Sequence, residues 1–113
     1  MTLPRSPEGN LTLFDVANNV AHLVQKNGWS EDVFERITFM ASELGEISKE
    51  ALAIQKSTDP DKREAARKRL AVELFDMLWN VVALGKSCQV SPAEIEQAAR
   101  TKMKLNDSRD FPY

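Results

Sequence analysis

Two pairs of acidic residues are the part of this sequence best suited to chemistry. The first pair is Glu43 and Glu46, and the second is Glu73 and Asp76. Each pair is spaced by three residues, so on a helix both carboxylates project from one face. The residues around the second pair are almost wholly apolar, and carboxylates are costly to bury there unless a positive charge neutralises them. A divalent metal ion shared by the four carboxylates would supply that charge.

The ligand types narrow the choice of metal. Sites built from oxygen ligands alone favour Mg²⁺, with Mn²⁺ as the alternative. Helical bundles that hold two irons use histidines in Glu-x-x-His pairs, and the only histidine, His22, belongs to no such motif, so a di-iron oxidase is disfavoured. Mg²⁺ held by a few carboxylates usually completes its shell with water and substrate phosphates. A nucleotide polyphosphate is therefore the natural substrate class.

Four helices are expected to position these residues. The apolar periodicity predicts helices over residues 11–26, 30–56 and 60–86, and a fourth from residues 91–94 to about residue 105. The expected N-terminal caps are Thr12 with Asp15, Ser30, Asp59 before Pro60, and Ser91 with Glu94. No alternating strand pattern competes, so the fold class is all-α. We expect a flexible arm at residues 1–10, a helical domain at 11–105 and an irregular tail at 106–113.

The second and third expected helices carry matching polar stripes. The stripes are Glu43, Glu46 and Glu50 on one helix, and Glu73, Asp76 and Asn80 on the other. A short connection makes these helices antiparallel neighbours, and facing stripes would bring four carboxylates together. The alternative is that each stripe is the solvated side of an amphipathic helix. For the helix of residues 30–56 both interpretations stay open, whereas the apolar surroundings of the next helix favour a buried polar seam.

The composition indicates the class of protein. A chain of 113 residues with 42% hydrophobic and 28% charged residues suits one soluble domain. Its net charge of −2 gives no general attraction to nucleic acid, and its single cysteine allows no internal disulfide. The start lacks a signal-peptide pattern, and no apolar run approaches the ~20 residues of a membrane span. We therefore expect a cytoplasmic protein with no membrane or nucleic-acid partner.

Several motifs, in order and spacing, resemble those of the MazG-like all-α nucleotide pyrophosphohydrolases. That superfamily also contains the dimeric dUTPases and the dCTP pyrophosphatases. The matching motifs, spread over about residues 12–112, are Asn27-Gly28-Trp29, Ser42-Glu43-Leu44-Gly45-Glu46, Glu73-Leu74-Phe75-Asp76-Met77-Leu78, Val81-Val82-Ala83-Leu84 and Lys102-x-x-x-Asn106-x-x-Arg109-x-x-Pro112. The resemblance implies Mg²⁺-dependent hydrolysis of (deoxy)nucleoside triphosphates to monophosphate and pyrophosphate, a house-cleaning of the nucleotide pool.

The same resemblance implies a role for each site residue. The metal ligands would be Glu43, Glu46, Glu73 and Asp76, with Glu43 or Glu46 also serving as the catalytic base. The phosphate contacts would be Lys102, Asn106 and Arg109, although Lys104 and Asp110 depart from the family's more compact basic tail. The base contacts would be Asn80 and Trp29, while Trp79 is expected in the core or in a subunit contact.

A bundle this short cannot easily cover so apolar a third helix. We therefore expect a four-helix bundle completed by homo-oligomerisation, as a homodimer or a homotetramer, with sites shared between subunits. The competing hypothesis belongs to a different class: a non-catalytic helical module that binds nucleotide or regulates a partner through oligomerisation.

Overall fold

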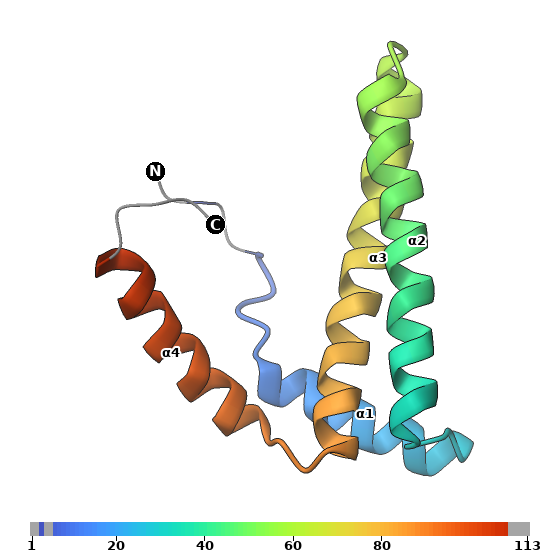
Figure 1. Ribbon diagram of the computed structural model, residues 1–113. Helices are drawn as coiled ribbons and strands as arrows, with labels where there is room; N and C mark the ends of the chain where they lie inside the picture. The colour runs from blue at the N-terminus through green and yellow to red at the C-terminus, as the bar shows by residue number, and fades with distance from the viewer. Residues whose placement is uncertain (1–2, 4–5, 109–113) are drawn as a thin grey trace.

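The computed structural model describes Leu3 and residues 6–108, and all regular structure in that part of the chain is α-helical. The elements are α1 (Leu13–Asn27), α2 (Val33–Lys56), α3 (Pro60–Ser87) and α4 (Pro92–Ser108). The all-α prediction is confirmed. Figure 1 shows α2 and α3 side by side as an antiparallel hairpin, with α1 crossing its base and α4 diverging from it.

Three of the four predicted helix starts are confirmed. Thr12 and Asp15 form a reciprocal capping box at α1, and Asp59 caps α3 with Pro60 in the first turn. At α4 the Glu94 N–H donates to Ser91 Oγ at 3.1 Å. Each bond satisfies a backbone N–H that the first helical turn leaves without a partner.

Two predicted boundaries are wrong. Asp32, not Ser30, caps α2, because its carboxylate accepts from the Glu35 N–H at 3.0 Å and suits the positive end of the helix dipole. The C-terminal tail is not irregular from residue 106, since α4 continues to Ser108. No glycine or proline interrupts this segment before Pro112, so nothing in the residue types ends the helix at 105.

The core lies where α1 crosses α3. Val16, Val20 and Val24 recur every fourth residue on α1 and pack against Val82 and Ala83 of α3. Gly28 ends α1 in the left-handed conformation (φ 63°), a conformation that glycine adopts without a Cβ clash. The chain turns there and continues through Trp29 toward α2.

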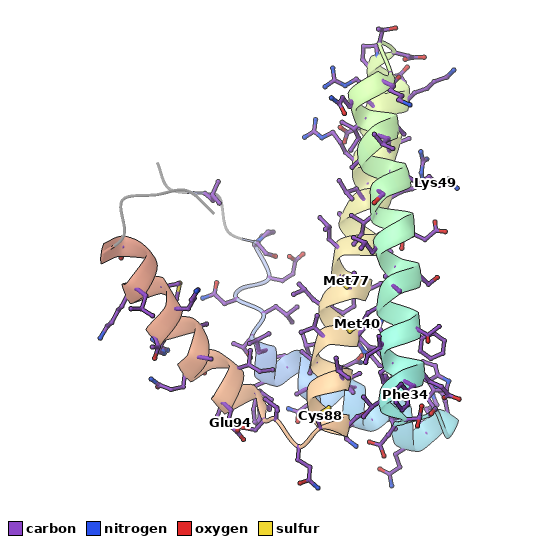
Figure 2. All side chains as sticks on the ribbon, viewed as in Figure 1. Phe34, Met40, Lys49, Met77, Cys88 and Glu94 are labelled. Carbon is purple, nitrogen blue, oxygen red and sulfur yellow. The ribbon has the colours of Figure 1, made fainter. Side chains whose placement is uncertain are left out.

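Side chains that recur every seven residues line the contact between α2 and α3, which we call the hairpin seam. Seven-residue recurrence is typical of helices that cross at a shallow angle. The seam residues considered below are Arg36, Glu43 and Glu50 on α2, and Arg69, Glu73, Asp76 and Asn80 on α3. Met40 and Ile47 are also half-buried on α2, and Figure 2 shows Met40 and Met77 on facing parts of the hairpin.

The chain is too open to be a closed bundle by itself. Its radius of gyration is 16.6 Å, against about 13 Å for a compact domain of this length. Its accessible surface is 8942 Å², against about 6,200 Å² for a compact monomer of 12.7 kDa. The exposed large apolar side chains include Leu44 on α2 and Val72, Leu74, Phe75, Leu78 and Val81 on α3. Within one chain, therefore, many of the apolar side chains around Glu73 and Asp76 are exposed rather than buried in a core.

None of the helices in the described part of the chain has the length and apolar content that a membrane crossing requires.

Candidate metal centre

Three of the four predicted metal ligands converge at the hairpin seam. Carboxylate oxygens of Glu43, Glu73 and Asp76 all lie within 4.8 Å of one another. Each of these side chains is half-buried. The second helix supplies one carboxylate and the third supplies two, so the cluster depends on the antiparallel pairing of α2 and α3. We call these three residues the acidic cluster.

Glu46 lies outside the acidic cluster. Its side chain is exposed on α2, because Met40 and Ile47 occupy the inward positions next to Glu43. Three residues along a helix turn a side chain by about 60° from its starting direction, whereas seven return it to within about 20°. Glu46 is nevertheless near enough for its charge to act on Glu43, as the pKa of Glu43 shows.

No basic side chain of the described residues forms an ion pair with the acidic cluster. The same seam offers a direct comparison. Glu50, two turns beyond Glu43, is neutralised by Arg69, whose Nε donates to its carboxylate at 2.8 Å. In contrast, Glu43 Oε2 is buried and has no hydrogen-bond partner among the described residues. A buried acceptor without a donor is costly, and a cation at this point would remove the cost.

Burial raises the pKa of Glu43 to about 7, from its ordinary 4.5. A proton shared with Glu73 contributes to the rise, and so does repulsion by the negative charges of Glu73, Asp76 and Glu46. Without a cation, the cluster holds a proton near neutral pH. The donor set fits Mg²⁺, because it offers only carboxylate oxygens and part of one carboxylate has no other partner.

The raised pKa predicts that the metal-free protein loses stability as the pH rises. Glu43 keeps its proton in the folded chain between pH 4.5 and about 7, while the unfolded chain has already released it. Its stabilising contribution is therefore fully present below the unfolded pKa and is lost as the pH rises through the folded pKa. In EDTA, the thermal midpoint of the wild type should fall between pH 5 and pH 8 relative to that of Glu43→Gln. Parallel pH curves for the two proteins would contradict this prediction.

Two adjoining cavities open beside the acidic cluster. One, of about 320 Å³, is lined by Trp29, Ser30, Arg36, Phe39, Ser42, Glu43, Trp79 and Asn80. The other, of about 340 Å³, is lined by Asn19, Leu23, Trp29, Glu43, Phe75, Asp76, Trp79 and Asn80. They share Trp29, Trp79, Asn80 and Glu43. An aromatic space therefore adjoins the carboxylates, which suits a ligand with a flat ring.

The two tryptophans form one wall of this space. Trp29 and Trp79 meet edge to face, with ring centroids 5.7 Å apart and planes at 75°. Trp79 Nε1 donates to Asn19 Oδ1 at 3.0 Å, which fixes its ring. Trp29 remains 44% exposed, so one part of its indole is open to a ligand. Asn80 is buried and donates from Nδ2 to the Asp76 carbonyl oxygen at 2.9 Å.

Of the predicted phosphate contacts, Lys102 is not brought to the acidic cluster of its own chain. Lys102 is exposed on α4, and α4 diverges from the hairpin (Figure 1). Asn106 belongs to the same helix, and Arg109 lies outside the described residues.

Sequence reasoning missed Arg36, Phe39 and Asn19, which line the two cavities. A signal for Arg36 was present, because it precedes Glu43 by seven residues and so shares its helix face. An arginine at the end of an acidic stripe is easily taken for a surface residue, since arginine is rarely fully buried without a partner.

Comparison with known proteins adds no relative: no family model matches the chain, and no curated protein or solved structure is significantly similar to it.

Proposed function

We propose that this protein hydrolyses (deoxy)nucleoside triphosphates to monophosphate and pyrophosphate in a Mg²⁺-dependent reaction. The observation that carries the proposal is the acidic cluster, whose three carboxylates have no cationic partner among the described residues and whose Glu43 lines both aromatic cavities. The motif resemblance to the MazG-like pyrophosphohydrolases agrees with it, as does their house-cleaning role.

Glu43, Glu73 and Asp76 would hold Mg²⁺. When bound, the ion would supply neutralisation of the phosphate charge and a lower pKa for the attacking water. Glu46 is our candidate for the base that takes the proton from that water. It is exposed and lies outside the acidic cluster, yet its charge raises the pKa of Glu43, so it combines proximity with a free carboxylate.

The base of the substrate would occupy the aromatic cavities. Trp29 offers a partly exposed indole for stacking. Asn80 lines both cavities, and its Nδ2 bond to the Asp76 carbonyl leaves Oδ1 as an acceptor for a base N–H. The bond to the Asp76 main chain also fixes the Asn80 amide one turn from a proposed metal ligand.

The phosphate contacts would come from a second copy of the chain. The open shape of one chain supports a homodimer or homotetramer, because its surface exceeds that of a compact monomer by about 2,700 Å². If two chains buried this excess against each other, the interface would total about 5,400 Å², the size of a large obligate interface. Because α4 diverges from its own hairpin (Figure 1), Lys102 on α4 would contact the acidic cluster of a partner chain. Asn106 and Arg109 follow Lys102 along the chain and would serve there too.

The test is a panel of canonical and modified deoxynucleoside and ribonucleoside triphosphates, assayed for pyrophosphate with Mg²⁺, with Mn²⁺ and with EDTA. We expect pyrophosphate and monophosphate from at least one substrate, and none in EDTA. Tight nucleotide binding without turnover would favour the non-catalytic helical module instead. Turnover that persists in EDTA would contradict the role of the acidic cluster.

A further inference from the structure

Arg36 is a buried cation with no acidic partner among the described residues. Only 3% of it is exposed, and it forms none of the ion pairs found in residues 6–108. Its Nε donates to the Ser30 carbonyl oxygen at 2.9 Å, and its Nη2 donates to the same oxygen. A guanidinium carries more N–H donors than one carbonyl oxygen can accept. Donors are therefore left for a further acceptor.

Two aromatic rings hold the guanidinium in place. Its central carbon lies 5.6 Å from the centroid of Phe39 and 5.5 Å from that of Trp79. Cation–π attraction offsets part of the cost of burying the charge, but a ring face accepts no directed hydrogen bond from the edge of the group. The Ser30 carbonyl and the rings fix the orientation of Arg36 and leave its edge with unused donors.

Arg36 lines the same cavity as Glu43 of the acidic cluster. The two residues are seven apart on one face of α2, a rise of about 10 Å, which is comparable to the length of a nucleoside from base edge to 5′ oxygen. A nucleotide with its phosphates at the acidic cluster would therefore bring its base to the level of Arg36.

We propose that Arg36 selects bases that carry a ring carbonyl group, by donating a hydrogen bond to that oxygen. Uracil, thymine, cytosine, guanine and hypoxanthine have such an oxygen. Adenine carries an amino group where hypoxanthine carries this oxygen. An N–H of Arg36 would then face an N–H of the adenine amino group, and no hydrogen bond could form between them. This inference rests on the proposed function in taking the ligand to be a nucleotide, and it adds a specificity-determining residue to that site.

The experiment uses nucleosides without phosphate, titrated onto the full metal-free chain in EDTA. Binding is followed through the indole N–H signals of Trp29 and Trp79 in nitrogen-15 NMR spectra. Deoxyinosine and deoxyadenosine form a matched pair, because they differ only at the carbonyl-bearing edge of the purine. Deoxyinosine and thymidine should bind roughly tenfold or more tightly than deoxyadenosine, the value of one charge-assisted hydrogen bond.

Variants locate the effect. Arg36→Lys keeps the charge but loses the planar fork, and it should lower thymidine affinity about tenfold and remove the preference for deoxyinosine. Arg67→Gln, at an exposed arginine of α3, should change neither the thymidine affinity nor the preference for deoxyinosine over deoxyadenosine. Circular dichroism and thermal melting verify that each variant folds, and the wild-type comparison of nucleosides needs no variant.

Four results would overturn the inference. The first is equal affinity of the wild type for deoxyinosine and deoxyadenosine, and the second is no binding of any nucleoside. The third is a thymidine affinity that Arg36→Lys leaves unchanged. The fourth is that Arg36→Lys binds pyrophosphate with Mg²⁺ more weakly but binds nucleosides as the wild type does. The last would make Arg36 a phosphate contact. If neither purine nucleoside binds, the thymidine affinities of the wild type and of Arg36→Lys decide whether the inference holds. The titration needs neither metal nor turnover, so it tests this inference separately from the proposed function. Selective nucleoside binding without triphosphate hydrolysis would overturn the proposed function alone. Triphosphate hydrolysis without selective nucleoside binding would overturn this inference alone.

Discussion

Glu73→Gln and Asp76→Asn should each lower kcat for pyrophosphate release by at least about a hundredfold, or about 3 kcal/mol of transition-state stabilisation. Each substitution replaces a charged oxygen of the acidic cluster with a neutral amide of nearly the same shape. The helical fold should survive, because both side chains are only half-buried. In EDTA the thermal midpoint should rise in each variant, since one charge is removed from a cluster that repels itself. The measurements are steady-state kinetics and thermal melting.

Glu50→Gln is the matched control for these variants. Glu50 lies on the same seam, but Arg69 neutralises it, so its loss should leave kcat close to that of the wild type. Glu46→Gln tests whether Glu46 is the catalytic base rather than a metal ligand. It should lower kcat and leave the Mg²⁺ affinity near the wild-type value, whereas Glu73→Gln should lower both kcat and the Mg²⁺ affinity. A fully active Asp76→Asn variant would remove the metal-site assignment.

Replacing Leu74 and Leu78 together by lysine should convert the proposed oligomer to a monomer. Both residues lie on the exposed apolar surface of α3, 47% and 52% exposed in one chain, and burial of a leucine side chain is worth about 2 kcal/mol. Two lysines would replace that gain with the cost of desolvating charge. The measurement is the mass in solution by light scattering. Gln55→Lys, at an exposed position near the end of α2, controls for added charge.

Mixing two inactive variants would test whether subunits share sites. If Lys102 serves the acidic cluster of a partner, Lys102→Ala and Glu73→Gln should each have low activity alone. Mixed oligomers should regain part of it, because some sites would combine an intact acidic cluster with an intact Lys102. A wild type that is monomeric at assay concentration would contradict the shared site, and so would a mixture no more active than its parts.

The sequence predicted the elements well because local signals determine them. Capping pairs and proline positions defined three helix starts, and the spacing of Glu43, Glu73 and Asp76 placed them on facing helices. Glu46 shows the limit of that reasoning: at three residues from Glu43 it belonged to the stripe, but Met40 and Ile47 fill the inward positions beside Glu43 and leave it exposed. The partner helix determines which residues beside Glu43 face the hairpin seam. The spacing of polar residues along one helix does not reveal it.

The direction of α4 and the partners that bury Arg36 were not predictable for a different reason. The position of α4 depends on long-range packing, and its apolar side chains Met103 and Leu105 remain exposed in one chain, so local signals determined its start but not its direction. Arg36 is buried through the Ser30 carbonyl and two aromatic rings. Ser30 lies in the turn before α2 and Trp79 on another helix, and only the fold brings them together.

The most direct test of the central claim is phosphorus-31 NMR of the products formed from a deoxynucleoside triphosphate with Mg²⁺ in ¹⁸O-labelled water. The proposed function predicts pyrophosphate and a nucleoside monophosphate, with the label in the monophosphate, because the water would attack the α-phosphorus. Formation of nucleoside diphosphate and inorganic phosphate, label in the pyrophosphate, or no turnover across the whole nucleotide panel would contradict it.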